Sequence, residues 1–287
     1  MNVYITMDME GISGITTGDM ARSGSAEWAH RGRQLATDDV NAAIEGALAA
    51  GAKRIWVQDM HDSGETILRE RLHPAAELIT GCHNVVGHMP GLDSSFDAVF
   101  LVGFHAMMGT RFAHFDHTIS TACISQVRFN GRPVGELGIF AGYAGFCGVP
   151  VALVTGDVAA TQEAADFLGD VTTVAVKQGL GRFATRSLRA EGTQALIRQT
   201  AEQGLKRPNK VWKPDAPLTI AVDFLRSAEA DLAEILPDAQ RTGARTVEYT
   251  HDSWQMTFRG LQTIVSLAGL AASRWAAALY TKGNPVI

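Results

Sequence analysis

Short, nearly continuous apolar runs alternate along the chain with segments whose apolar residues recur at helical spacing. Four runs predict buried strands: the opening run that ends at Met7, and residues 54–58, 97–103 and 149–155. Helical spacing at 26–50 and 159–168 predicts helices between or after them, and a shorter helix is expected at 67–72. This alternation is typical of an α/β fold with a mostly parallel sheet flanked by helices.

Two departures from this pattern complete the predicted architecture. Residues 121–130 and 132–139 flank the dipeptide Asn130-Gly131, which predicts a β-hairpin insertion with a tight turn. After Thr185 the order of strands and helices indicates a smaller C-terminal α+β domain. We therefore expect a catalytic α/β domain at 1–185 and the smaller domain at 186–287.

Composition excludes several classes of function. The 287 residues are 46% hydrophobic and carry a net charge of -5, without a cluster of basic and aromatic residues, so a nucleic-acid partner is not expected. Cys82, Cys123 and Cys147 lack CxxC spacing and predict neither a disulfide framework nor a thiolate metal site. We expect no signal peptide and a cytoplasmic protein, and polar residues within 261–280 favour a buried or interface helix over a membrane span.

Acids and histidines follow the predicted strands. Asp8 and Glu10 share one side of an extended chain, and two carboxylates so placed need a cation, a shared proton or open water. An ordinary solvated strand end is the alternative. The other strands end in Asp59 with His61, in His105 and in Asp157, with Glu136 expected on the second hairpin strand. Because ligands bind beyond the carboxyl ends of parallel strands, these groups are expected to converge.

Such a set of oxygen and imidazole ligands suits zinc or a similar divalent ion in a catalytic site. Two ions sharing one carboxylate would activate a water for hydrolysis, and carboxylates at i and i+2 suit that arrangement. The chain has no HExxH motif, and Gly179 with Gly181 lacks the rest of a nucleotide loop. Asp157 is equally well placed to cap the helix that follows it.

Several ordered segments resemble the DppA family of D-aminopeptidases, the M55 metallopeptidases. They cover essentially the first 180 residues, with weaker similarity beyond: 8–14 (DMEGISG), 59–61 (DMH), 103–106 (GFHA), 117–118 (HT), 132–138 (RPVGELG), 155–157 (TGD) and 176–178 (VKQ). The resemblance implies a zinc hydrolase with two Zn²⁺ per subunit. Its implied substrates are short peptides or aminoacyl amides, from which it removes N-terminal residues, preferentially D-amino acids such as D-alanine.

The same resemblance implies roles for individual residues and an assembly. Asp8 would bridge both metals, Glu10 and His61 would complete one, and His105 and Glu136 would complete the other. The implied assembly is a homodecamer of two stacked pentamers.

The catalytic histidine is implied at His117, followed by Thr118, with His114 as the alternative because the spacing from His105 exceeds the family pattern by one residue. His117 would stabilise the oxyanion or pass a proton to the leaving amine. Asp59 or Asp157 are candidates for binding the substrate amino group, as is a metal.

Two other functions remain open from the sequence. A metal pair of this kind also serves amidases and phosphoesterases. A catalytically silent oligomeric binding protein with the same fold would be expected to lack metal, although this chain has a residue of the required type at every implied ligand position.

Overall fold

The computed structural model describes residues 1–81 and 88–280 of the chain, so Cys82 lies outside the described residues. The chain folds into two compact units. The first contains residues 1–116 and 136–213, and the second contains residues 117–135 and 214–287. The division departs from the expected boundary at 185, because the β-hairpin belongs to the second unit while the helix after residue 189 belongs to the first.

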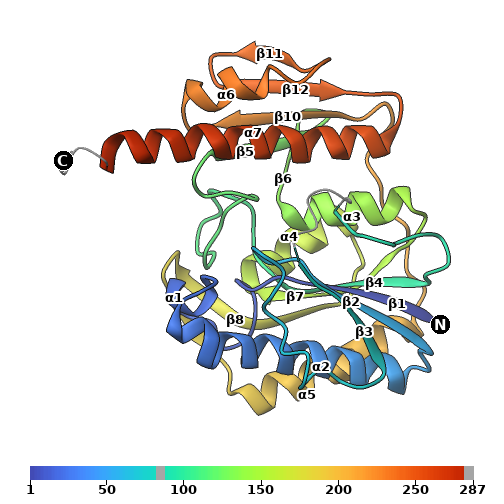
Figure 1. Cartoon of the computed structure of the whole chain (residues 1–287). Helices are drawn as coiled ribbons and strands as arrows, with labels where there is room; N and C mark the ends of the chain where they lie inside the picture. Colours follow the sequence, from blue (N-terminus) through green and yellow to red (C-terminus); the bar gives the residue numbers. More distant parts are fainter. Residues whose placement is uncertain (82–87, 281–287) are drawn as a thin grey trace. The chain divides into compact units, whose positions relative to one another are not determined.

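The first unit is built on a seven-stranded sheet in the order β3-β2-β1-β4-β7-β8-β9 (Figure 1). All neighbouring strands pair in parallel except β8 and β9, which are antiparallel. The strands are β1 (Asn2–Met7), β2 (Arg54–Asp59), β3 (Ala76–Ile79), β4 (Ala98–Phe104), β7 (Val151–Asp157), β8 (Thr173–Gly181) and β9 (Ala184–Ser187). The mostly parallel α/β fold predicted from the sequence is confirmed.

Helices cover both faces of this sheet, which explains its apolar strands (Figure 1). One core joins the sheet to α2 (Arg33–Ala49) and α5 (Ala190–Lys206), and the other joins it to α3 (Glu136–Phe146) and α4 (Val158–Leu168). Every residue of β4 and β7 is buried. The short α1 (Gly18–Ala21) and a π-helical turn at Trp28–Gly32 lead from β1 into α2.

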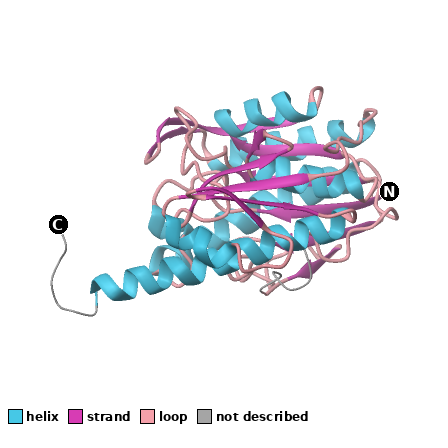
Figure 2. Ribbon diagram, turned by 90° about the horizontal axis from the view of Figure 1, so that it is seen from above, coloured by secondary structure: helices cyan, strands magenta, loops and turns pink. Residues whose placement is uncertain are grey.

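The second unit contains an antiparallel sheet in the order β11-β12-β10-β5-β6 with two helices. Its elements are β5 (Ile124–Phe129), β6 (Arg132–Val134), β10 (Thr219–Phe224), α6 (Ser227–Ala233), β11 (Gln240–Gly243), β12 (Thr246–Thr250) and α7 (Trp254–Tyr280). Figure 2 shows α7 leading toward the C-terminus. The expected turn is present, with positive φ angles of 48° at Asn130 and 81° at Gly131. Within 1–81 and 88–280, no helix has both the length and the hydropathy to cross a membrane.

Two local predictions are wrong. Residues 67–72 form turns instead of a helix, and Thr37 and Asn41 of α2 hydrogen-bond the backbone at Leu68, Arg71 and His73. Glu136 is the first residue of α3 instead of a strand residue, because β6 ends at Val134.

Candidate metal centre

The order of the strands brings the candidate ligands together. From β1 the chain adds β2 and β3 on one side, and then crosses to add β4 on the other. Such a reversal of strand order opens a crevice at the carboxyl ends of the strands. Asp8 and Glu10 follow β1, His61 follows β2, and His105 follows β4, so all four side chains lie at this reversal.

Asp8 lies between two histidines. Its Oδ1 atom is 3.2 Å from His61 Nδ1, and its Oδ2 atom is 3.2 Å from His105 Nε2. The Asp8 residue is buried, with 3% of its surface exposed. The two oxygens of one carboxylate therefore face two separate imidazoles, which is the geometry required of a bridging ligand.

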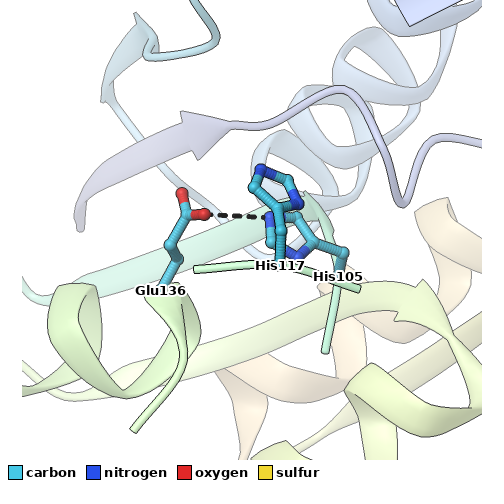
Figure 3. Close-up of side chains that lie close together, drawn as sticks. All are labelled: His105, His117 and Glu136. Carbon is cyan, nitrogen blue, oxygen red and sulfur yellow. Dashed lines mark ion pairs between the residues drawn. The ribbon is translucent and has the colours of Figure 1, made fainter. Parts of the chain in front are cut away.

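Each histidine also faces a second carboxylate. Glu10 Oε2 is 3.3 Å from His61 Nδ1, and Glu136 Oε1 is 3.1 Å from His105 Nε2. Figure 3 shows the ion pair between Glu136 and His105 as a dashed line. The side chains therefore form two triads that share Asp8, one completed by Glu10 and His61 and the other by His105 and Glu136.

The outer nitrogen of each imidazole is held by a backbone carbonyl. His61 Nε2 lies 2.8 Å from the carbonyl oxygen of Ala21, and His105 Nδ1 lies 3.0 Å from that of Ala106. A carbonyl only accepts hydrogen bonds, so these nitrogens carry the protons. The other nitrogen of each ring faces the carboxylates, and in the neutral ring it would carry the lone pair that a metal ion requires.

The electrostatics also favour a bound cation. Burial alone lowers the pKa of His61, but the charge of Glu10 and the hydrogen bond to Asp8 outweigh it and hold that pKa well above its usual value. His105 follows the same pattern, with Glu136 as the largest opposing influence on its pKa. Asp8, Glu10 and His105 offer ligand atoms that all lie within 4.8 Å of one another. Buried oxygen and imidazole donors at such distances suit zinc or a similar divalent ion.

His114 lies behind the loop that follows β1. It is buried, its Nε2 atom is 3.4 Å from the carbonyl oxygen of Thr16, and its backbone amide donates to Asp157. Burial, aided by the charge of Lys177, lowers the pKa of His114 to about 4. His114 is therefore neutral at ordinary pH.

His117 is the first residue of the second unit, directly after the last residue of the first unit's opening segment. Its neighbour Asp116 is firmly held, because Asp116 accepts hydrogen bonds from the amide of Gly109 at 2.7 Å and from Arg182 at 2.6 Å. Figure 3 labels His117 together with His105 and Glu136.

The two remaining acids hold backbone amides. Asp59 accepts a hydrogen bond from the amide of Ile67, which secures the loop that contains His61. Asp157 accepts from the amide of Ala160 at 2.8 Å and so caps α4, as one of its two sequence interpretations predicted. Both side chains are fully or almost fully buried, and each is engaged with the backbone.

Sequence reasoning assigned no role to Lys177, although it lies in one of the recognised segments. The side chain is 3% exposed and contacts the loop after β1. Burial lowers its pKa to about 8. The available signal was a lysine directly after the apolar residues 174–176, since a lysine is rarely buried without polar partners.

Known proteins resemble this chain over most of its length. The family model described as D-aminopeptidase, Peptidase M55, matches residues 1–263. The D-aminopeptidase of Bacillus subtilis (strain 168) is 32% identical over 275 residues, which are 93% of this chain and 98% of that protein.

A solved structure matches at the level of the fold as well. It is the Zn-dependent D-aminopeptidase DppA from Bacillus subtilis, described as a self-compartmentalizing protease. The TM-score is 0.90 at 31% identity, and the match covers 94% of this chain and 98% of that one.

Proposed function

Because the chain belongs to the M55 family of D-aminopeptidases, we propose that it is a zinc-dependent aminopeptidase. Its proposed substrates are short peptides or aminoacyl amides with an N-terminal D-amino acid such as D-alanine. The observation that carries the metal chemistry is Asp8, whose two oxygens each face a different buried histidine at 3.2 Å.

The proposed site holds two Zn²⁺ ions. Asp8 would bridge them, Glu10 and His61 would complete one ion, and His105 and Glu136 would complete the other. When bound, such a pair lowers the pKa of a water toward neutrality and polarises the carbonyl that the water attacks. Ala21 and Ala106 support this arrangement, since their carbonyls hold the outer nitrogens of the two histidines and so orient the other nitrogen of each ring toward the carboxylates.

We assign the proton transfer to His117. Its imidazole would stabilise the oxyanion or pass a proton to the leaving amine. His114 is the weaker candidate, because it is buried and its ring faces the backbone of Thr16. Because Asp59 and Asp157 hold backbone amides, a metal is the proposed partner of the substrate amino group.

The proposed assembly is a homodecamer of stacked pentamers. Its support is the description of the structural relative as a self-compartmentalizing protease, together with coverage of 98% of that chain. Sedimentation of the purified protein tests the assembly separately from the activity.

A substrate panel tests the reaction. Purified protein would be assayed on D-alanine and L-alanine anilides and on a phosphate ester, with and without added zinc. We expect zinc-dependent release from the D-alanine anilide. Hydrolysis of the phosphate ester instead would show a different metal hydrolase, and protein purified without chelator that contains no metal would show a binding protein.

Two substitutions connect the activity to the site. His105→Ala and Glu136→Ala each remove one half of the closest contact in the second triad, at 3.1 Å. Both should lower bound zinc and abolish hydrolysis. Unchanged metal content and unchanged hydrolysis in either variant would contradict the proposed ligand set.

A further inference from the structure

Lys177 of β8 extends its ammonium group into the loop that follows β1. The Nζ atom donates to three backbone carbonyl oxygens, those of Glu10 at 2.5 Å, Ile12 at 3.0 Å and Ile15 at 2.9 Å. An ammonium has three N–H donors, and these three carbonyls can accept all of them. The bonding offsets the cost of burying a charged lysine, which is otherwise large.

The same loop is also held by α2. Asp39 is fully buried and accepts a 2.8 Å hydrogen bond from the amide of Ser13 and a 2.6 Å hydrogen bond from its hydroxyl. The Gly11 amide adds a 2.7 Å hydrogen bond to the carbonyl of Gly103 at the end of β4. Residues 10–15 therefore form a loop whose backbone is fixed by a lysine, an acid and the neighbouring strand.

This loop contains one of the proposed metal ligands. The carbonyl that Lys177 binds most closely belongs to Glu10 itself, while the Glu10 carboxylate faces His61. Apart from the shared Asp8, the second triad depends on other elements, because His105 follows β4 and Glu136 begins α3. A change at Lys177 is thus transmitted to the backbone of one triad.

We propose that Lys177 is a positioning residue that fixes Glu10 for the ion held by Glu10 and His61, and not for the ion held by His105 and Glu136. The inference rests on the proposed function, since it requires two bound ions. It assigns to a buried lysine of β8 a selective effect on one half of the metal pair.

The test measures zinc per chain across a series of buffered free-zinc concentrations. Lys177→Met keeps the length of the side chain but removes its donors. We expect this variant to bind one ion as the unaltered protein does and the other about 10- to 100-fold more weakly, as is usual when a group supporting a ligand is lost. Lys177→Arg keeps the charge but replaces the ammonium with a flat guanidinium, and it should show the same selective loss to a smaller extent.

Two backgrounds identify the weakened ion. In Glu136→Gln, the remaining ion depends on Glu10, so adding Lys177→Met should remove it. In Glu10→Gln the Glu10 side is already lost, so adding Lys177→Met should change little. Lys206→Met is the matched control, because Lys206 is an exposed lysine whose partner is Glu202 on the surface of α5.

Melting of each variant without metal separates positioning from general damage. Retained melting with selective loss supports the proposal. Loss of both ions, by unfolding or otherwise, or unchanged binding of both, would overturn it. If the unaltered protein binds fewer than two ions, that result contradicts the proposed function. If the unaltered protein binds two ions and the Lys177 variants bind both equally well, the result contradicts only the role proposed for Lys177.

Discussion

Gly11→Ala tests how tightly the loop after β1 is built. A methyl group at Gly11 would lie 1.9 Å from the carbonyl oxygen of Phe104 and 2.5 Å from the carbonyl carbon of Gly103. Both atoms belong to the backbone of the β4 end, which cannot rotate aside as a side chain does. Even a crowded contact needs 3.0 Å, so the loop and β4 must separate by at least about 1 Å.

This separation should affect both stability and the metal site. Overpacking of a rigid site costs about 1–3 kcal/mol. At about 2–4 °C per kcal/mol for a protein of this size, the melting temperature should fall by several degrees. Because Glu10 is covalently joined to Gly11, its carboxylate moves as well, and a misplacement of about 1 Å commonly costs about 100-fold in rate.

The assays are thermal melting, zinc content and hydrolysis of a D-alanine anilide. Gly192→Ala is the control, because a methyl group at that position of α5 meets nothing within 4 Å. That variant should melt at the same temperature or higher, since alanine favours a helix over glycine by about 1 kcal/mol. A Gly11→Ala protein with unchanged melting, two ions and full activity would refute the reasoning.

Three further predictions concern the ligands and their surroundings. Asp8→Asn should lose or scramble both ions, whereas Glu10→Gln should keep the ion at Glu136, as metal analysis of the two variants would show. Chelation should lower the melting temperature, because an ion present at about 1,000 times its Kd adds about 4 kcal/mol to the free energy of unfolding. Equal melting temperatures with and without chelator would contradict this prediction. Burial raises the pKa of Asp39 from 3.8 to about 6, so the folded protein binds a proton at Asp39 more tightly than the unfolded chain does. The stability that this proton contributes is fully present below pH 3.8 and is lost as pH rises through 6. The melting temperature of Asp39→Asn, relative to the unaltered protein, should therefore rise between pH 4 and 6, by the equivalent of about 1.4 kcal/mol per pH unit.

The central strands β1, β4 and β7 of the first unit were predictable because each is buried on both faces. Such strands leave near-continuous apolar runs in the sequence, and β4 is the clearest example, with all seven residues buried. Polar residues directly after these runs were predictable as site candidates for the same reason. Asp8, His61 and His105 break the apolar pattern where the strand leaves the core.

Features that depend on packing between distant segments were not predictable. The turns at 67–72 have an amphipathic pattern, yet side chains of α2 bind their backbone and replace helical hydrogen bonds. Glu136 lies in α3 because β6 ends at Val134. A hairpin pattern in the sequence does not define the end of its second strand to within several residues. Lys177 was missed because its partners are backbone carbonyls, which every residue has and which no sequence pattern marks.

The topology explains why Asp8, among the candidate ligands, is the one that faces both His61 and His105. Met7, the last residue of β1, is paired with Asp59 of β2 on one side and with Val102 of β4 on the other. The next residue, Asp8, therefore has the end of a neighbouring strand on either side. A side chain after β2 or β4 adjoins β1 on one side alone, with β3 or β7 on the other. The proposed bridging position is therefore a property of the strand at which the order reverses. A carboxylate supplies it best, because its two equivalent oxygens can face opposite directions from one residue.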